Sequence, residues 1–165
     1  MTTRENVGSW LEGGPGGDQG ARGARLGLPA QGPGSAAGVG RRIVALVVDW
    51  TVCLAISATF FPADETATFL VRADSIVTLA VFALENLLLV GLLGFTLGHR
   101  LLGLRVRTAG YAPGGTPVSD DARAPGLVRG FVRTALLCLV IPAVVWDADG
   151  RGLHDRLAGT AIVRR

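Results

Sequence analysis

Three apolar stretches dominate the pattern of hydrophobic and polar positions along the chain. They run over about 43–61, 75–95 and 127–146. A helix needs about 20 apolar residues to cross the ~30 Å hydrocarbon layer of a bilayer, so the first two stretches predict transmembrane helices. The third stretch is weaker, because Arg129 and Arg133 lie in its first two turns. It predicts a short helix that either spans the membrane or re-enters it.

The chain before the first apolar stretch has a different composition. Residues 1–38 are rich in Gly and Pro and contain few large apolar side chains. Burial of so little apolar surface does not offset the entropy lost on ordering. We therefore expect a disordered tail over 1–38 and a membrane domain over 39–165.

A shorter amphipathic pattern follows the second apolar stretch. Leu97, Leu101 and Leu104 recur at helical spacing, and Arg100 and Arg107 fall on another face. This pattern is typical of a helix in the membrane interface. The frayed end of the second span, with ordinary Arg anchors, would give the same spacing. Taken together, the stretches predict an all-α membrane protein with two transmembrane helices, a third short helix and an interfacial amphipathic helix.

The placement of Arg predicts the orientation in the membrane. Arg41 and Arg42 precede the first span, and 96–126 carries four Arg, whereas 62–74 carries three acidic residues and one Arg. Positive charge concentrates in the cytoplasmic loops of membrane proteins, so we expect a multi-pass protein with a cytoplasmic N-terminus. A third full span would place the four C-terminal Arg residues outside the cell. A re-entrant segment keeps them inside, and we slightly favour it.

Composition excludes several classes of function. Only 18% of the residues are charged, against roughly 25% in soluble domains. The net charge is +3, and the sequence has no basic stripe interleaved with aromatics, so we expect no nucleic-acid partner. Its two cysteines lack the spacing of a disulfide framework or a metal site. Because the sequence contains no nucleophile–base motif or phosphate-binding loop either, we expect neither enzymatic activity nor a cofactor.

Charged residues inside the apolar stretches form the candidate polar site: Asp49, Glu85 and Arg133. A charge inside a membrane is costly unless it is paired or hydrated. Asp49 and Arg133 each lie six residues into their stretches, so one interpretation is a structural Asp49–Arg133 ion pair. In another, Asp49 and Glu85 face one cavity as a cation or proton relay, unless Glu85 is a neutral hydrogen-bonding group. We expect Arg42, two turns before Asp49, to reach the cytoplasmic headgroups.

Three motifs in the chain resemble the RDD family of small bacterial membrane proteins, named for one Arg and two Asp. The motifs run from Arg42 to Asp49, from Gly94 to Val106 and from His154 to Val163. The resemblance implies that the family-motif residues are Arg42, Asp49 and Asp155, and that the protein resides in the plasma membrane of a bacterium. The family has no established molecular function, and transport of an unidentified ligand has been suggested for it.

Two functions are compatible with these features. The first is transport of an ion or small ligand, with Asp49 as the titrating group. Three short segments cannot enclose a pathway, so a transporter of this size would be a homo-oligomer in the lipid bilayer. The second is a non-transporting scaffold or accessory protein, in which the polar residues hold the fold and the tail recruits a protein partner.

Overall fold

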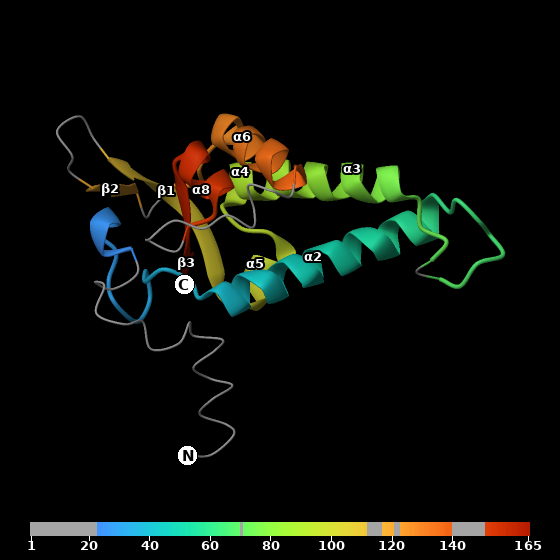
Figure 1. Ribbon diagram of the computed structural model, residues 1–165, viewed down its shortest axis with the longest axis horizontal. Coiled ribbons are helices and arrows are strands. Elements are labelled where there is room, and N and C mark those ends of the chain that lie inside the picture. The colour runs from blue at the N-terminus through green and yellow to red at the C-terminus, as the bar shows by residue number, and fades with distance from the viewer. Residues whose placement is uncertain (1–22, 70, 112–116, 121–122, 140–150) are drawn as a thin grey trace, which may run out of the picture.

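Two long antiparallel helices lie side by side and meet, at one end, a module of short helices and a small sheet (Figure 1). The computed structural model describes residues 23–69, 71–111, 117–120, 123–139 and 151–165. The first long helix is α2 (Val39–Phe60); the second is continuous from α3 (Ser75–Glu85) through the π-helical segment η2 (Asn86–Val90) into α4 (Gly91–Leu93). The remaining elements are η1 (Ala24–Leu26), α5 (Leu97–Leu101), β1 (Leu104–Tyr111), β2 (Pro117–Asp120), α6 (Leu127–Cys138), α8 (Leu153–Ala158) and β3 (Thr160–Arg164).

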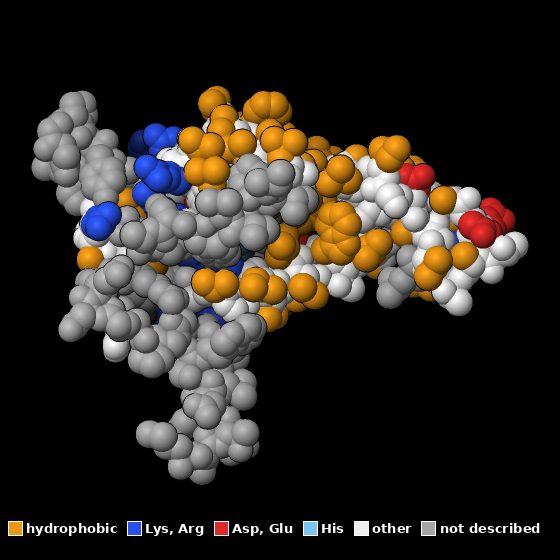
Figure 2. Space-filling view, viewed as in Figure 1, with side chains coloured by type: hydrophobic (Ala, Val, Ile, Leu, Met, Phe, Trp, Pro, Cys, Tyr) orange, Lys and Arg blue, Asp and Glu red, His pale blue; other side chains and the backbone are white. Residues whose placement is uncertain are grey.

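Within the described residues, two helices are long and apolar enough to cross a membrane, Val39–Phe60 and Ser75–Leu93. They coincide with the stretches predicted over 43–61 and 75–95, so this part of the prediction is confirmed. Figure 2 shows hydrophobic side chains along the helix pair, Arg side chains at the sheet end and acidic side chains at the opposite tip. The charges are therefore segregated along the axis of the helix pair.

The sheet was not predicted, and the expectation of an all-α chain is wrong. The sheet has three antiparallel strands in the order β2-β1-β3, with Leu104 opposite Arg164 and Thr108 opposite Thr160. The predicted amphipathic helix stops at Leu101. Gly103 then takes a φ of 65°, which favours glycine and ends the helix. Beyond it the chain extends into β1.

The hydrophobic core lies where the helix pair meets this sheet. Leu104 and Val106 of β1 are fully buried and pack with Ala45 of α2, Val90 of η2 and Ile162 of β3. Alternating side chains of a strand point to opposite faces, so burial of Leu104 and Val106 aims one face of β1 at the helices. The core thereby fixes the sheet against the ends of both long helices.

Residues 23–38 pack against the sheet instead of belonging to a disordered tail. Leu26 and Leu28 are buried against Ala161 and Val163 of β3. The Ala37 amide donates to the Ile162 carbonyl at 2.9 Å. The predicted tail therefore cannot extend to residue 38, and the rest of that prediction, over 1–22, lies outside the described residues.

The third apolar stretch forms α6, which has 12 residues and is shorter than a membrane span. The remainder of the predicted stretch, 140–146, lies outside the described residues. After α8, the chain returns to the sheet as β3, which pairs with β1. The C-terminus therefore lies at the same end of the helix pair as the start of α2 (Figure 1).

Gly98 allows α5 to lie directly against α2, which gives the first prediction. A Cβ atom at Gly98 would clash with the Ala45 carbonyl oxygen, a backbone atom that cannot rotate away. Gly98→Ala should therefore lower the free energy of unfolding by about 1–3 kcal/mol, as overpacking does elsewhere. Chemical unfolding in detergent micelles measures the loss. Leu101→Ala in the same helix, at a side chain that is 73% exposed, is the control and should change it by no more than about 0.5 kcal/mol.

Candidate functional site

A cavity of about 540 Å³ lies between α2, α3, α6 and the C-terminal elements α8 and β3. Away from the sheet, apolar side chains from both long helices and α6 line it. Toward the sheet its lining is polar, with charged or imidazole groups from four elements, α2, α5, α6 and α8. These groups are Arg42, Asp49, His99, Arg133, His154 and Asp155. The three family-motif residues suggested by the resemblance, Arg42, Asp49 and Asp155, thus all reach one cavity.

Asp49 is buried at 3% exposure, and both its carboxylate oxygens accept hydrogen bonds. The Thr96 hydroxyl donates to Oδ2 at 2.6 Å, and the Gly98 amide donates to Oδ1 at 2.6 Å. Gly98 lies in the first turn of α5, where backbone N–H groups have no partner within the helix and attract negative charge. Asp49 therefore stabilises the start of α5 from the neighbouring helix α2.

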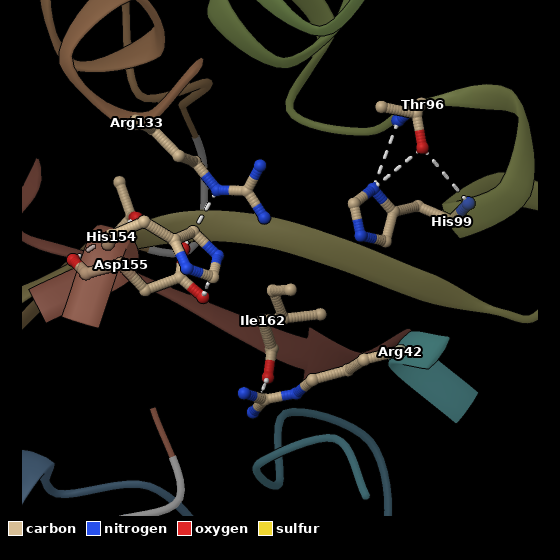
Figure 3. A network of polar contacts seen from close by, with 8 residues as sticks. Arg42, Thr96, His99, Arg133, His154, Asp155 and Ile162 are labelled. Carbon is tan, nitrogen blue, oxygen red and sulfur yellow. Dashed lines mark hydrogen bonds and ion pairs between the residues drawn. The ribbon is translucent and has the colours of Figure 1, made fainter. Parts of the chain in front are cut away.

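The predicted Asp49–Arg133 pair is wrong. The Arg133 Nε atom donates instead to Asp155 Oδ1 at 2.8 Å, with the side chains 3% and 0% exposed. The Thr160 hydroxyl donates to the same oxygen at 2.8 Å. Counting residues from the start of each apolar stretch could not identify the Arg133–Asp155 pair. Such a count compares only the depth of residues in the membrane, and it leaves out partners that the fold brings from other parts of the chain. The ion pair connects α6 to α8 (Figure 3).

Arg42 was expected to reach the lipid headgroups, and this is also wrong. Its side chain is 7% exposed, and its Nη2 atom donates to the Ile162 carbonyl at 3.3 Å (Figure 3). The first turn of α2 lies against β3 inside the module, so the guanidinium meets a strand carbonyl rather than lipid. Arg42 therefore helps to hold the start of the first long helix to the sheet.

The charge of Asp155 is balanced within the cavity wall. Burial alone would raise the pKa of Asp155, but Arg133, His154 and Arg42 together hold that pKa well below its usual range. The nearer ring nitrogen of His154, Nε2, lies 3.6 Å from Asp155 Oδ2. Asp155 is therefore an ionised group that is held in place by the Arg133 guanidinium and the Thr160 hydroxyl.

His99 is a neutral imidazole on the opposite wall of the cavity. Burial, followed by the nearby charge of Arg133, lowers the pKa of His99 to about 3. Its Nδ1 atom accepts from the Thr96 amide at 3.3 Å and lies 2.8 Å from the Thr96 hydroxyl, so the ring proton is on Nε2. Figure 3 shows the ring contacting Thr96 along one edge only. Thr96 and His99 together form the capping box of α5.

Glu85 continues this polar network into the middle of the second long helix. The Cys53 thiol donates to Glu85 Oε2 at 3.2 Å, and the Glu85 carboxyl group is close enough to Asp49 for the two to interact electrostatically. Glu85 immediately precedes the π-helical segment η2, a rare helical form that is frequent at functional sites. The interpretation in which Asp49 and Glu85 both face one cavity is met for Asp49 but not for Glu85. Only Asp49 of the two lines the described cavity.

Sequence reasoning missed Thr96, His99 and His154 as parts of the site. The spacing of Thr96 and His99 is that of a capping box, but with His in place of the usual Glu or Gln it gives a weak signal. His154 precedes a motif Asp and was identifiable only through that motif. In the described part of the chain, no group of three or more His, Cys, Asp or Glu side chains is placed to hold a metal ion.

The helix pair, the short module that closes one end of it and the buried polar network define a small membrane protein with a site at its Arg-rich end. A comparison with protein families identifies its kind: residues 36–159 match the RDD family, and the chain belongs to it. Neither the curated proteins nor the solved structures contain a match. The assignment of the family-motif residues to Arg42, Asp49 and Asp155 stays a prediction.

The buried ion pair gives the second prediction. Arg133→Met leaves the Asp155 carboxylate buried without its main counter-charge, which typically costs about 3–5 kcal/mol of unfolding free energy. The matched control is Arg129→Met, one turn earlier on α6, where the side chain is exposed and only weakly bonded to the Gly159 carbonyl at 3.5 Å. The control should cost less than about 1 kcal/mol. Equal losses for the two variants in micelle unfolding experiments would contradict the assigned pairing.

The lowered pKa of His99 gives the third prediction. Below about pH 6.5 the imidazole of His99 binds a proton in the unfolded chain but not in the folded protein. The free energy of unfolding therefore decreases as the pH is lowered, by up to about 1.4 kcal/mol per pH unit. Unfolding curves between about pH 7 and pH 5 measure this slope, a range in which most carboxylates of the unfolded chain stay ionised. His99→Gln should flatten it. A slope that survives unchanged in this variant would contradict its assignment to His99.

Proposed function

We propose that the protein carries protons through the membrane at Asp49 and Glu85, coupled to an ion or small ligand, as a homo-oligomer. One observation supports the proposal: a series of neighbouring polar groups runs from Glu85, in the middle of the second long helix, past Asp49, whose hydrogen bond to Thr96 leads to His99 at the cavity. In this proposal the protein is not an enzyme and needs no cofactor.

The Thr96 hydroxyl is the centre of the relay. It lies 2.6 Å from Asp49 and 2.8 Å from His99 Nδ1, but it has only one proton to donate. When Asp49 is ionised, Thr96 donates to it. When Asp49 is protonated, its own O–H can donate to the Thr96 oxygen, and the Thr96 proton turns to His99. The hydroxyl thus transmits the protonation state of Asp49 to the imidazole without moving the backbone.

Glu85 supplies the inner end of the relay. Its Oε1 atom is buried and has no hydrogen-bond partner among the described residues. Two neighbouring carboxyl groups in a low dielectric do not both ionise, and a shared proton is the usual result. In this proposal the shared proton passes between Glu85 and Asp49.

The topology that goes with this proposal places the sheet end in the cytoplasm of a bacterial cell and the 62–74 loop outside. The segregation of Arg and acidic side chains along the helix axis supports it. In α6, Val128 is 80% and Phe131 62% exposed, as expected for a helix with lipid on its outer face. We propose that α6 is the re-entrant or interfacial helix and does not span.

A homo-oligomer is part of the proposal because the chain cannot enclose a pathway alone. The structure describes two helices that could span the membrane, and Glu85 lies near the middle of one of them. Protons that reach Glu85 still need a polar route to the far side. A second copy packed on the apolar outer faces of the helix pair would supply the missing wall.

The fourth prediction is that Asp49→Asn abolishes proton flux into proteoliposomes without unfolding the protein. An Asn at this position can still accept from the Gly98 amide and can donate to the Thr96 oxygen, so α5 keeps its cap. It cannot titrate, so flux should fall to the level of protein-free vesicles. Asp64→Asn, an exposed carboxylate of the loop, is the control and should leave flux unchanged.

Outcomes of this experiment separate the relay from a structural role. Normal flux through assembled Asp49→Asn protein would exclude the relay. An Asp49→Asn protein that fails to assemble would make Asp49 a structural residue, and Thr96→Val, which removes only the hydroxyl, would then test the relay. Lack of flux in the wild type as well would favour the alternative scaffold function, tested by co-purification of a partner with and without residues 1–22, since residues 23–38 pack against the sheet.

A further inference from the structure

The cavity combines two kinds of lining that match the two ends of an amphipathic molecule. Its volume, about 540 Å³, falls within the roughly 300–1,000 Å³ typical of small-molecule sites. The polar groups gather at the sheet end, while the other end is lined by Trp50, Leu79, Phe82 and Leu137. A wholly polar solute would leave this apolar end unfilled, and a pure hydrocarbon would leave the polar end unpaired.

Two hydrogen-bond donors at the polar end are uncommitted. Arg133 is 2% exposed, and its Nη1 atom is buried with no hydrogen-bond partner among the described residues. A buried donor on a charged group is costly to leave unpaired. His99 accepts at Nδ1, so its Nε2–H is a second donor on the cavity wall. Figure 3 shows the Arg133 guanidinium and the His99 ring facing each other across this space.

Most carboxylate oxygens at the same end are already engaged. Both oxygens of Asp49 accept short hydrogen bonds from α5 and the residue before it. Asp155 Oδ1 accepts from Arg133 and Thr160, whereas Oδ2 lies 3.6 Å from His154 Nε2 and accepts no hydrogen bond from the described residues. Arg42 adds a second guanidinium to the lining. The space that remains therefore favours an anion over a cation.

The apolar end is continuous with the outer surface of the helix pair. Trp50 is 38% and Leu79 41% exposed, although both line the cavity. The Trp50 and Phe82 rings pack edge to face, with centroids 5.4 Å apart, and form a rigid aromatic wall. If the helix pair spans the membrane, this opening faces lipid, so an occupant would enter from the hydrocarbon layer rather than from water.

We infer that the cavity binds a single-chain amphipathic anion from the membrane, with its carboxylate or phosphate head at Arg133 and His99 and its hydrocarbon chain between Trp50 and Leu137. Arg133 binds such a head with Nη1 while Nε keeps its bond to Asp155, because the guanidinium fork carries donors on both sides. This binding does not depend on the proton relay, and its test does not measure flux.

The fifth prediction uses Trp50 as the reporter. With Trp10 and Trp146 replaced by Phe, Trp50 is the only Trp in the chain. Dibromostearate, whose bromine atoms quench Trp fluorescence on contact, should quench Trp50 saturably in micelles of an uncharged detergent. Its methyl ester has the same chain without the charge. It should bind about tenfold more weakly, because a charge-assisted hydrogen bond is lost.

Matched variants locate the head and the chain. Arg133→Gln should weaken dibromostearate binding about tenfold, whereas Arg129→Gln on the exposed face of α6 should not change it. If Arg133→Gln fails to fold, Leu137→Phe keeps the ion pair and narrows the apolar end, and it should weaken binding as well. Equal quenching by the acid and the ester, or equal affinity in the two Arg variants, would overturn the proposal. If inorganic phosphate alone displaces dibromostearate, the site binds a soluble anion. That result would overturn the proposed role of the hydrocarbon chain in binding.

Discussion

The arrangement of this protein depends on one buried carboxylate, Asp49. A charge that is 3% exposed on an apolar helix is tolerated only when its oxygens are satisfied, and here both are. The donors come from Thr96 and Gly98, at the start of a helix of only five residues that would be marginal alone. Asp49 therefore fixes α5 on α2, and α5 in turn leads directly into β1. The position of the whole sheet module follows from this contact.

A second polar centre, Arg133 with Asp155, ties the C-terminal part of the chain to the same place. It joins α6 to α8 and, through Thr160, to the start of β3. Arg42 then connects β3 back to the first turn of α2. The two centres meet across one cavity instead of forming a single pair. Such an arrangement makes each polar residue both a structural link and part of the lining, so single substitutions at these positions need stability and function measured side by side.

The features that could be predicted from the sequence are those set by local pattern. The two long helices follow from uninterrupted apolar runs, and the presence of a polar site follows from charges within them. The sheet could not be predicted, because β1 shows only a short alternation and its partner β3 lies more than fifty residues later in the chain. The same reason explains the wrong partner for Asp49. Residue counting along helices gives depth, whereas Thr96 and Gly98 reach Asp49 only because the chain turns back at Gly94, where φ is 79°.

The central claim is that Asp49 and Glu85 hold and exchange a proton while Asp49 remains bonded to α5. Infrared difference spectroscopy of the reconstituted protein, recorded across a pH step, measures this directly through the carbonyl stretch of protonated carboxylic acids. The account predicts a protonated-carboxyl band that changes with pH, shifts in deuterium oxide and disappears in Glu85→Gln. A spectrum without any such band, or one that is identical in the wild type and in Glu85→Gln, would contradict it.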